Sequence, residues 1–360
     1  MMDTVNYKCA NCGGPLQFDA AKQKFACEYC GSDFTEQELQ SRREYSDLDA
    51  RLSGDARPEP APSDADDDFS SAAAYLCQSC GAEVIADQNT AATFCVYCHS
   101  PVVLSNRMTG EMKPHKVIPF KISEQEAKNR FLAFCKKKKF LPGDFLSSGQ
   151  LDMMKGVYYP YWLIDSLKKG GVRATAKKKR RWTEGEYEYT ETKTYRVVRA
   201  GSIDFKGYPC SGVKSEENSK ALKYVNPFQD EDFRPFTMSY LSGFLAEKRD
   251  VERQDVQQKV DKELYDYARK IFRESIDGYD SVTIDDMSLN TMNETWQYGL
   301  LPVWMLTYSY KGKNYLYAMN GQTGKNFGEL PLSGAKLAVF AAALFAGVFL
   351  LGTLGGYFLL

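Results

Sequence analysis

The chain has 360 residues, and 46 Lys and Arg face 47 Asp and Glu, so its formal net charge is -1. A balance this even removes the simplest argument for nucleic-acid binding, which is a strongly basic chain. Hydrophobic residues make up 43% and aromatic residues 13%, which excludes wholesale disorder and predicts at least one sizeable core. The mean hydropathy of -0.45 is that of a soluble protein, but it averages over one strongly apolar segment at the C-terminus.

Eight of the ten cysteines form four Cys-x-x-Cys pairs, which fall into two groups with one spacing. The groups are Cys9, Cys12, Cys27 and Cys30, then Cys77, Cys80, Cys95 and Cys98. The second group repeats the first 68 positions later, from Cys9 to Cys77. This displacement also places Tyr7 on Tyr75, Gly13 on Gly81 and Tyr29 on Tyr97, which indicates an internal duplication.

Each group predicts a zinc ribbon with one structural Zn²⁺, so we expect two ions per chain. Two thiolates on a tight turn bind a metal from one side, and a second turn completes the tetrahedron. Glycine follows the second cysteine in three pairs and tolerates the positive φ of such a turn. His99 takes this place in the fourth pair. We interpret it as a polar neighbour, with Cys98 as ligand and Cys₃His coordination as the alternative.

Disulfides and redox-active pairs are the alternative interpretations of these cysteines. Disulfides would require export, and residues 1–10 contain no apolar run typical of a signal peptide. A redox site would require one pair in a βαβ context. Cys135 and Cys210 lie outside the groups and are interpreted as small buried hydrophobes. With only His99 and His115 in the chain, nucleophilic catalysis is disfavoured, and we expect no enzyme.

The composition divides the chain into five segments. We assign zinc ribbon 1 to 1–34, a polar helix and acidic linker to 35–73, zinc ribbon 2 to 74–104, an α+β body to 105–333 and a transmembrane helix to 337–360. Thr35 and Glu38 form a capping-box pattern at the start of the polar helix. Residues 44–68 carry nine acidic side chains and interleaved prolines, which predicts an extended linker that lets the two ribbons move independently.

Helices and strands are expected to alternate along the body. Ser123 and Glu126 form a second capping box, and four lysines at 136–139 complement the dipole at the end of that helix. Residues 156–165 (GVYYPYWLID) are typical of a buried strand with an irregularity at Pro160.

The second half of the body adds strands and a longer helix. Partial alternation around 187–198 predicts strands, with turns at Gly185 and Gly201. A helix over 251–276 is predicted by a face of Val256, Val260, Leu264, Ala268, Ile271 and Ser275. Residues 300–330 are typical of paired strands, with turns at 311–314 and at Asn320-Gly321. This pattern predicts an antiparallel sheet.

The C-terminal segment 337–360 contains 24 consecutive residues without a charge. As a helix it would extend roughly 36 Å, enough for a hydrocarbon core of ~30 Å. A buried core helix is the alternative, but it would normally show a polar face. Lys325 and Lys336 precede the segment, and thiolates must stay reduced to hold zinc. We therefore expect a single-pass, tail-anchored protein of the cell membrane, with its ribbons and body in the cytoplasm.

Residues 165–199 carry eleven basic side chains against five acidic ones, and we call this segment the basic arm. Its densest run is Lys177, Lys178, Lys179, Arg180 and Arg181. A solvated hairpin is the simplest interpretation. Two sharper interpretations are contact with anionic membrane lipid and contact with nucleic acid. The membrane is favoured because the C-terminal anchor already holds the arm near lipid.

The two ribbons, the segment YYPYWLID, residues 240–247 (YLSGFLAE) and residues 300–325 resemble a bacterial family of double zinc-ribbon, tail-anchored membrane proteins. Members are often labelled TFIIB-type zinc ribbon protein or primosomal replication helicase. A helicase needs a phosphate-loop motor, and GQTGK at 321–325 lacks the required spacing. Related proteins look to be encoded beside SPFH-domain and TPM-domain membrane proteins. The resemblance therefore implies a scaffold that brings a cytoplasmic partner to the membrane.

These observations together predict an α+β protein with two N-terminal zinc ribbons, a mixed α+β body with an antiparallel sheet, and one C-terminal transmembrane helix. We expect a membrane-anchored adaptor that recruits a cytoplasmic protein partner. The alternative is a membrane-associated nucleic-acid-binding protein that uses the ribbons and the basic arm.

Overall fold

The computed structural model describes residues 4, 7–42, 73–143, 145 and 151–359. The predicted acidic linker at 44–68 lies outside these residues. The first cysteine module contains a three-stranded antiparallel sheet of β1 (Leu16–Asp19), β2 (Lys24–Cys27) and β3 (Asp33–Phe34). A helix starts at residue 36, and its capping box is confirmed: the Thr35 N–H donates to the Glu38 carboxylate at 2.7 Å, and the Glu38 N–H donates to the Thr35 hydroxyl at 3.3 Å.

The second cysteine module is joined to the sheet of the body. Its strands are β4 (Ala73–Leu76), β5 (Glu83–Ala86), β6 (Thr90–Phe94) and β7 (Pro101–Val103). Strand β6 pairs with β7 on one side and with β12 (Leu245–Glu247) on the other. Strands β6 and β7 are therefore part of the ten-stranded sheet, whereas β4 and β5 form a two-stranded sheet of their own.

In the described residues the body is built on that sheet and three helices, with short 3₁₀ turns between the elements, and a fourth helix follows the body at the C-terminus. Its strands also include β8 (Lys116–Val117), β9 (Lys155–Glu184), β10 (Tyr187–Ser211), β11 (Arg234–Pro235), β13 (Ser281–Tyr310), β14 (Lys313–Asn320) and β15 (Asn326–Gly328). The helices are α2 (Glu124–Lys136), α4 (Glu216–Val225), α5 (Arg253–Glu274) and α6 (Gly334–Leu359). The 3₁₀ turns are η1 (Ser105–Met108), η2 (Gly110–Met112), η3 (Asp230–Asp232) and η4 (Met238–Leu241). The mixed α+β fold agrees with the prediction, but the sheet is not wholly antiparallel, because β8 pairs with β13 and β12 with β9 in parallel.

Aromatic side chains fill the centre of the body. Phe120 stacks on Phe244 with ring centroids 4.2 Å apart, and Tyr158 and Trp304 each meet the Phe120 ring edge-on at 5.0 Å. A Cβ atom on Gly156 would lie 2.6 Å from the Phe244 ring, so only glycine allows this approach of β9. The predicted buried strand around 156–165 is confirmed as the first third of β9.

The irregularity expected at Pro160 is not found. Strand β9 keeps its register with β13 through the pair Leu300 and Pro160. On the other side of β9, β10 ends opposite Tyr161, and β12 pairs only with Val157 and Tyr158. Pro160 lies in the gap between these two partners, so its missing N–H costs no ladder hydrogen bond. Its carbonyl accepts a hydrogen bond from the Gly212 N–H at 2.9 Å.

The predicted body helices are present, with two differences in the buried face of the second. In α2 the Ser123 hydroxyl accepts the Glu126 N–H at 3.3 Å. Helix α5 buries Val260, Leu264, Ala268 and Phe272. Ile271, which we assigned to this face, is 43% exposed, and Ser275 is exposed as the C-cap after the last helical residue. At the end of α5 the apolar face therefore includes Phe272 instead of Ile271. The side of the helix that carries Phe272 packs on the curved arm. Helix α4 was not predicted.

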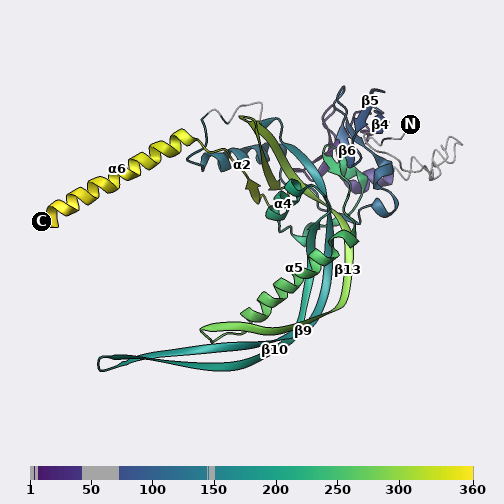
Figure 1. Ribbon diagram of the computed structural model, residues 1–360. Coiled ribbons are helices and arrows are strands. Elements are labelled where there is room, and N and C mark those ends of the chain that lie inside the picture. Colours follow the sequence, from purple (N-terminus) through teal and green to yellow (C-terminus); the bar gives the residue numbers. More distant parts are fainter. Residues whose placement is uncertain (1–3, 5–6, 43–72, 144, 146–150, 360) are drawn as a thin grey trace.

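Strands β9, β10 and β13 extend far beyond the body as one curved antiparallel sheet, which we call the arm (Figure 1). The basic arm, residues 165–199, is the part of it formed by β9 and β10. Helix α5 covers one face of the arm, where Phe272 packs with Val172, Ala174 and Val197. The turn at Gly185 is confirmed by its φ of +66°. The turn predicted at Gly201 is wrong, since Gly201 lies within β10 opposite Gly170. The paired Gly170 permits a close strand approach, because a Cβ there would lie 2.1 Å from the Ser288 carbonyl oxygen, whereas a Cβ on Gly201 would have no atom within 4 Å.

The hairpin predicted in 300–330 is confirmed, and its turn is shorter than expected. Strands β13 and β14 pair from Val303 and Asn320 to Tyr310 and Lys313. Only Lys311 and Gly312 connect them, with φ of +52° and +73°. Two positive φ angles are typical of the primed turns that match strand twist. The Asn320-Gly321 turn then leads into β15, which pairs with β14.

The two cysteine modules do not have the independence that the linker predicted. In the first module the Phe18 and Phe25 rings lie 5.4 and 5.9 Å from the Tyr240 ring. The Ser242 carbonyl accepts the Phe18 N–H at 3.0 Å. The segment 240–247 (YLSGFLAE) therefore holds the first module and, through β12, also pairs with the second. Both modules are fixed to the body by contacts that only the fold creates.

Candidate metal centres and basic arm

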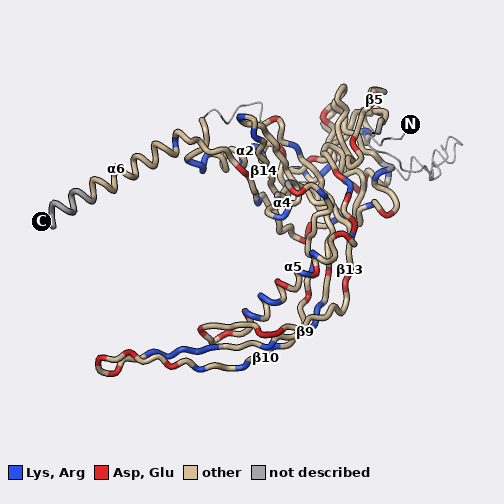
Figure 2. The backbone as a smooth tube through the Cα atoms, viewed as in Figure 1, with Lys and Arg blue, Asp and Glu red and all other residues tan. Residues whose placement is uncertain are grey.

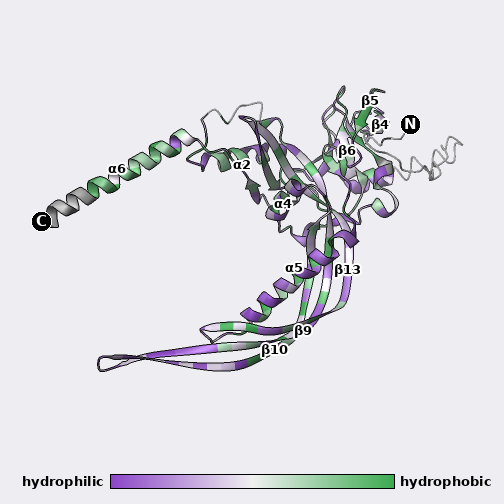
Figure 3. Ribbon diagram, viewed as in Figure 1, coloured by the Kyte–Doolittle hydropathy of each residue, from purple (hydrophilic) through white to green (hydrophobic). Residues whose placement is uncertain are grey.

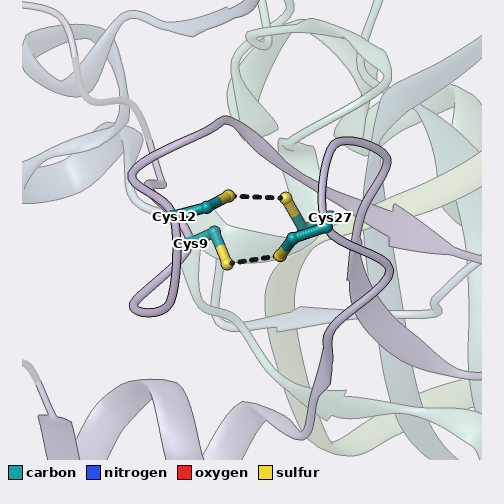
Figure 4. A group of neighbouring side chains, drawn as sticks. Cys9, Cys12 and Cys27 are labelled. Atoms are coloured by element: carbon teal, nitrogen blue, oxygen red, sulfur yellow. Dashed lines mark hydrogen bonds between the residues drawn. The ribbon is translucent and has the colours of Figure 1, made fainter.

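The first candidate metal centre is formed by two turns that flank β1 and β2. The sulfurs of Cys9, Cys12, Cys27 and Cys30 all lie within 4.8 Å of one another. Figure 4 shows the first three with their sulfurs turned toward a common centre. The Sγ–Sγ distances are 3.6 Å from Cys9 to Cys30 and 3.5 Å from Cys12 to Cys27. Two residues are buried and two exposed, so the centre lies at the module surface.

The second candidate centre repeats this geometry. Cys77 and Cys98 have sulfurs 3.7 Å apart, and so have Cys80 and Cys95. Ligands arranged tetrahedrally at a metal–sulfur bond of ~2.3 Å lie about 3.8 Å apart. A disulfide would require a sulfur–sulfur distance of ~2.05 Å. All eight thiols are free, so the geometry fits two tetrahedral metal sites and contradicts the disulfide alternative.

The backbone of each turn follows the expected pattern. Gly13, Gly31 and Gly81 have φ of +75°, +71° and +75°, and His99 takes the same left-handed position with φ of +55°. The N–H of each of these four residues donates to the carbonyl of the first cysteine of its pair. His99 is exposed, and Cys98 completes the four-sulfur group. The arrangement therefore favours Cys₄ over Cys₃His donors.

Two serines beside the clusters were not singled out from the sequence. The Ser32 hydroxyl and backbone N–H lower the pKa of Cys30 to about 6, and Ser100 does the same for Cys98. The Cys30 sulfur lies 3.3 Å from the Ser32 hydroxyl. Ser32 and Ser100 are related by the same displacement as the cysteines, so the internal repeat was the signal that could have found them.

The thiols of Cys12 and Cys80 resist ionisation, because their pKa values are raised to about 12. At Cys12 the backbone N–H of Gly14 favours the thiolate, but the sulfurs of Cys27 and Cys30 outweigh it and raise the pKa to about 12. The reason is that four neighbouring sulfurs cannot all carry a negative charge without a compensating cation. A divalent metal ion supplies that charge when bound, which again fits a metal-binding role.

The basic arm has two faces because side chains alternate along a strand. On the outer face, away from α5, Lys177, Lys179 and Arg181 lie opposite Thr194, Thr192 and Thr190 of β10. These three cations form no ion pair with any described residue, and all are exposed. Figure 2 shows this run as a continuous basic stretch behind an acidic tip.

The inner face of the arm tip combines charge with aromatic rings. Lys178 and Arg180 lie opposite Lys193 and Glu191. The Trp182 and Tyr189 rings stack with centroids 5.6 Å apart, and the Arg180 guanidinium lies 5.8 Å from the Trp182 ring. The five basic residues predicted as one site are therefore divided between two faces of different chemistry. The two-residue period of a strand was the signal for this division.

Helix α6 is long and apolar enough to span a membrane. Its segment Gly334–Leu351 has a mean hydropathy of 2.1, and none of it is buried in the structure. The helix projects away from the body and is apolar around its described length (Figure 3). The alternative of a buried core helix is therefore wrong.

Comparison with known proteins places the chain in a family. The uncharacterized protein YdjG of Bacillus subtilis (strain 168) is 31% identical to it over 346 residues, which cover 96% of both sequences. The chain belongs to the YdjG family. No family model and no solved structure matches it. The YdjG relationship covers nearly the entire chain, so it concerns the whole architecture and not the cysteine modules alone.

The body of this YdjG-family protein also contains an open cleft of about 470 Å³ between β10, α4 and α5. Inside it Glu263 accepts hydrogen bonds from the Tyr208 hydroxyl at 2.5 Å and from Lys223 at 3.0 Å. Cys210 lines the cleft, but burial raises the pKa of its thiol to about 11. Burial likewise raises the pKa of Cys135 to about 11. Both thiols are buried as expected, and neither has the low pKa of a reactive cysteine.

Proposed function

We propose that this protein is a membrane-anchored zinc-ribbon adaptor that recruits a cytoplasmic protein partner to the membrane. The observation that carries the proposal is the combination of two Cys₄ modules held on one body with an exposed, apolar C-terminal helix. The two modules with their closed metal sites would present surfaces to a protein partner, and α6 would attach the chain to the membrane. Such a combination suits recruitment better than chemistry, because four protein ligands leave no open metal position for a substrate.

Zinc is the metal that the donor set favours. Four thiolates in tetrahedral arrangement select soft or borderline ions, and Zn²⁺ is the most frequent structural choice. The role is structural. Each ion would hold one module together. The strands of the first module have four residues or fewer, and those of the second have five or fewer. The three-stranded sheet of the first module and the two-stranded sheet of β4 and β5 are too small to bury enough apolar surface alone, so the metal contributes folding free energy.

The proposed location is the cell membrane, with α6 as a single span and the modules in the cytoplasm. Reduced thiolates support the cytoplasmic side, because metal binding requires Cys to stay free of disulfides. Lys336, at the start of α6, bonds the Leu141 carbonyl at 2.7 Å and supports the positive-inside orientation.

The two modules offer matching surfaces for a protein partner. Tyr29 and Tyr97 occupy the same position in the repeat, and their side chains are 76% and 71% exposed. Exposed aromatic side chains on a rigid turn are typical anchors of protein interfaces. The family resemblance suggests SPFH-domain and TPM-domain membrane-associated proteins as the partners.

We expect the double variant Tyr29→Ala/Tyr97→Ala to lose partner capture while keeping its metal. The detergent-solubilised full-length chain would be co-purified with a tagged SPFH-domain or TPM-domain protein of the same organism. Loss of two interface anchors predicts at least a roughly tenfold drop in capture. Tyr187→Ala removes an equally exposed tyrosine (72%) from the arm and is the matched control. If the wild-type chain captured neither partner, or the double variant captured both equally well, the adaptor proposal would be rejected.

The basic arm favours a second interaction, with anionic lipid. Figure 1 shows the arm and α6 extending from the body toward the same side of the view, so a membrane around α6 would face the arm. Three unpaired cations on the outer face would each contribute ~1 kcal/mol near an anionic surface. Nucleic acid is the alternative ligand, because its phosphates suit the same cations.

We expect Lys177→Thr/Lys179→Thr/Arg181→Thr to weaken binding to phosphatidylglycerol vesicles on the order of a hundredfold. The chain would be truncated after Ser333, so that α6 does not mask the effect, and measured by vesicle sedimentation. Lys178→Thr/Arg180→Thr/Lys193→Thr removes equal charge from the inner face and should have a smaller effect. Salt-sensitive binding of duplex DNA without vesicle binding would favour the nucleic-acid function instead.

A further inference from the structure

Strand β10 has one edge that no strand covers. It pairs with β9, which is its only partner strand in the part of the chain that the structure describes. Its first eleven residues extend along the outer part of the arm, where Tyr187 and Tyr189 are 72% and 43% exposed. An open edge of this length displays a row of backbone N–H and C=O groups and is a template for another strand.

The sequence of this edge is symmetric about Thr192. Residues 187–197 are YEYTETKTYRV, so threonine and tyrosine recur at equal distances on both sides of Thr192. Charged residues recur in the same way but with opposite sign. Glu191 and Lys193 flank Thr192 directly, and Glu188 and Arg196 lie four residues away on either side. A strand with this pattern is complementary to an antiparallel copy of itself.

We propose that two copies of this chain pair edge to edge through residues 187–197 of β10, with a two-fold axis at Thr192. In this register Glu191 lies opposite Lys193 of the second copy, and Glu188 lies opposite Arg196. Thr190 meets Thr194, and Tyr189 meets Tyr195. Each pair occurs twice because the interface is isologous. Opposite charges, Thr–Thr pairs and aromatic pairs are the cross-strand combinations that stabilise sheets.

The charges within one chain support this partner. Lys193 lies directly opposite Lys178 of β9, a like-charge pair that destabilises the hairpin. Its compensating group is Glu191 of the same strand, 3.5 Å away, and Glu191 also lies opposite Arg180. One carboxylate therefore serves cations on two strands. In the dimer each Lys193 gains Glu191 of the second copy on its open side.

The aromatic rings of the inner face continue across the proposed interface. Trp182 stacks on Tyr189 within one chain. Tyr189 would meet Tyr195 of the second copy, and Tyr195 contacts Tyr279 with ring centroids 5.4 Å apart. Aromatic side chains that are partly exposed in one copy would thus form one row over three strands, which ends at Tyr279 in the loop before β13. The outer face with Lys177, Lys179 and Arg181 remains open, so dimerisation and lipid binding do not compete.

The register is set by charge. Moving the axis by one residue, to Glu191 or to Lys193, would place two like charges opposite each other at the axis itself. Because opposed residues are equidistant from the axis, each such move shifts the register by two residues and leaves the inner and outer faces in place, so the charges alone decide the register. Only complementary contacts occur when the axis passes through Thr192.

Cross-linking of the full-length chain in detergent micelles tests the register. Directly opposed residues have Cα atoms about 4.5–5.5 Å apart, within the range of a disulfide. Thr192→Cys should therefore form a covalent dimer under mild oxidation. Val198→Cys, an exposed position on the same strand, should not, because its two copies would lie on the order of 40 Å apart. Mixed Glu188→Cys and Arg196→Cys chains should cross-link to each other more than to themselves.

Charge reversal tests the energetics independently. Glu188→Arg would place like charges at two positions of the interface and should raise the dimer Kd roughly tenfold. Glu188→Arg/Arg196→Glu exchanges the signs and should restore dimerisation, which a general folding defect could not do. The mass in solution, corrected for detergent, is the readout. A monomeric wild-type chain overturns the proposal. The same result is expected if the β10 edge binds a different protein instead of a second copy. Cross-linking at Val198→Cys as fast as at Thr192→Cys also overturns the proposal.

Discussion

Replacing Cys27 with serine is expected to lower the zinc content of the purified chain from two ions to one and to unfold the first module. The Cys27 sulfur is buried and lies 3.5 Å from that of Cys12, so a hydroxyl there removes one of four ligands from a closed site. Structural zinc contributes about 10–16 kcal/mol of binding free energy in zinc-finger peptides, which is as large as the stability of a whole domain. Elemental analysis and limited proteolysis would measure the two effects.

The equivalent change in the second module should have wider consequences. Cys95→Ser removes a ligand from the module whose strand β6 pairs with β12, so the damage should extend to the edge of the body sheet. Cys135→Ala is the matched control, because it removes a buried thiol outside both clusters and should leave two ions bound. Two ions per chain in Cys27→Ser, or none in the wild type, would contradict the proposed zinc sites.

Deleting residues 337–360 is expected to move the protein from the membrane fraction to the soluble fraction almost completely. Nine large apolar side chains from Leu337 to Leu351 are 46–74% exposed in the structure, and a bilayer is the environment that buries them all at once. Each Leu, Ile, Phe or Val at a helix centre contributes roughly 0.3–0.6 kcal/mol to insertion, and the segment has no charge to offset the sum. Fractionation after a carbonate wash is the measurement.

A replacement helix provides the control for this deletion. An unrelated apolar helix of equal length in place of 337–360 should restore membrane association, because length and hydropathy decide insertion. If the full-length chain were released by the carbonate wash, the membrane location would be wrong. Restoration of partner recruitment by the replacement helix would further indicate that α6 serves only as an anchor.

Local sequence patterns predicted the features that local chemistry decides. The cysteine spacing predicted two four-sulfur groups, because two residues between thiols and a glycine after them define the turn by itself. The capping box at Thr35 and the N-cap role of Ser123 were also predicted correctly, since each depends on residues three apart. The second capping box is not complete, because the Glu126 carboxylate pairs with Arg130. The length and apolarity of the last helix required no tertiary contact.

The errors arose where a partner strand or helix decided the outcome. Gly201 was taken for a turn because its role depends on strands that lie far away in the sequence. Pro160 disturbs nothing because two different strands happen to leave a gap beside it. The five cations of the arm formed one run in the sequence, and only the pairing of β9 with β10 showed that they face two directions.

By itself, the sequence determined the two four-cysteine clusters, the α+β body that follows them and the apolar end, because each rests on residue types at short, regular spacing. Only the tertiary structure decided that the cysteine modules are fixed to the body through residues 240–247. It also decided that β9, β10 and β13 form an arm with an open edge. The reason is physical: a strand has no partner until the chain folds, and register, faces and edges are properties of pairs and not of single segments.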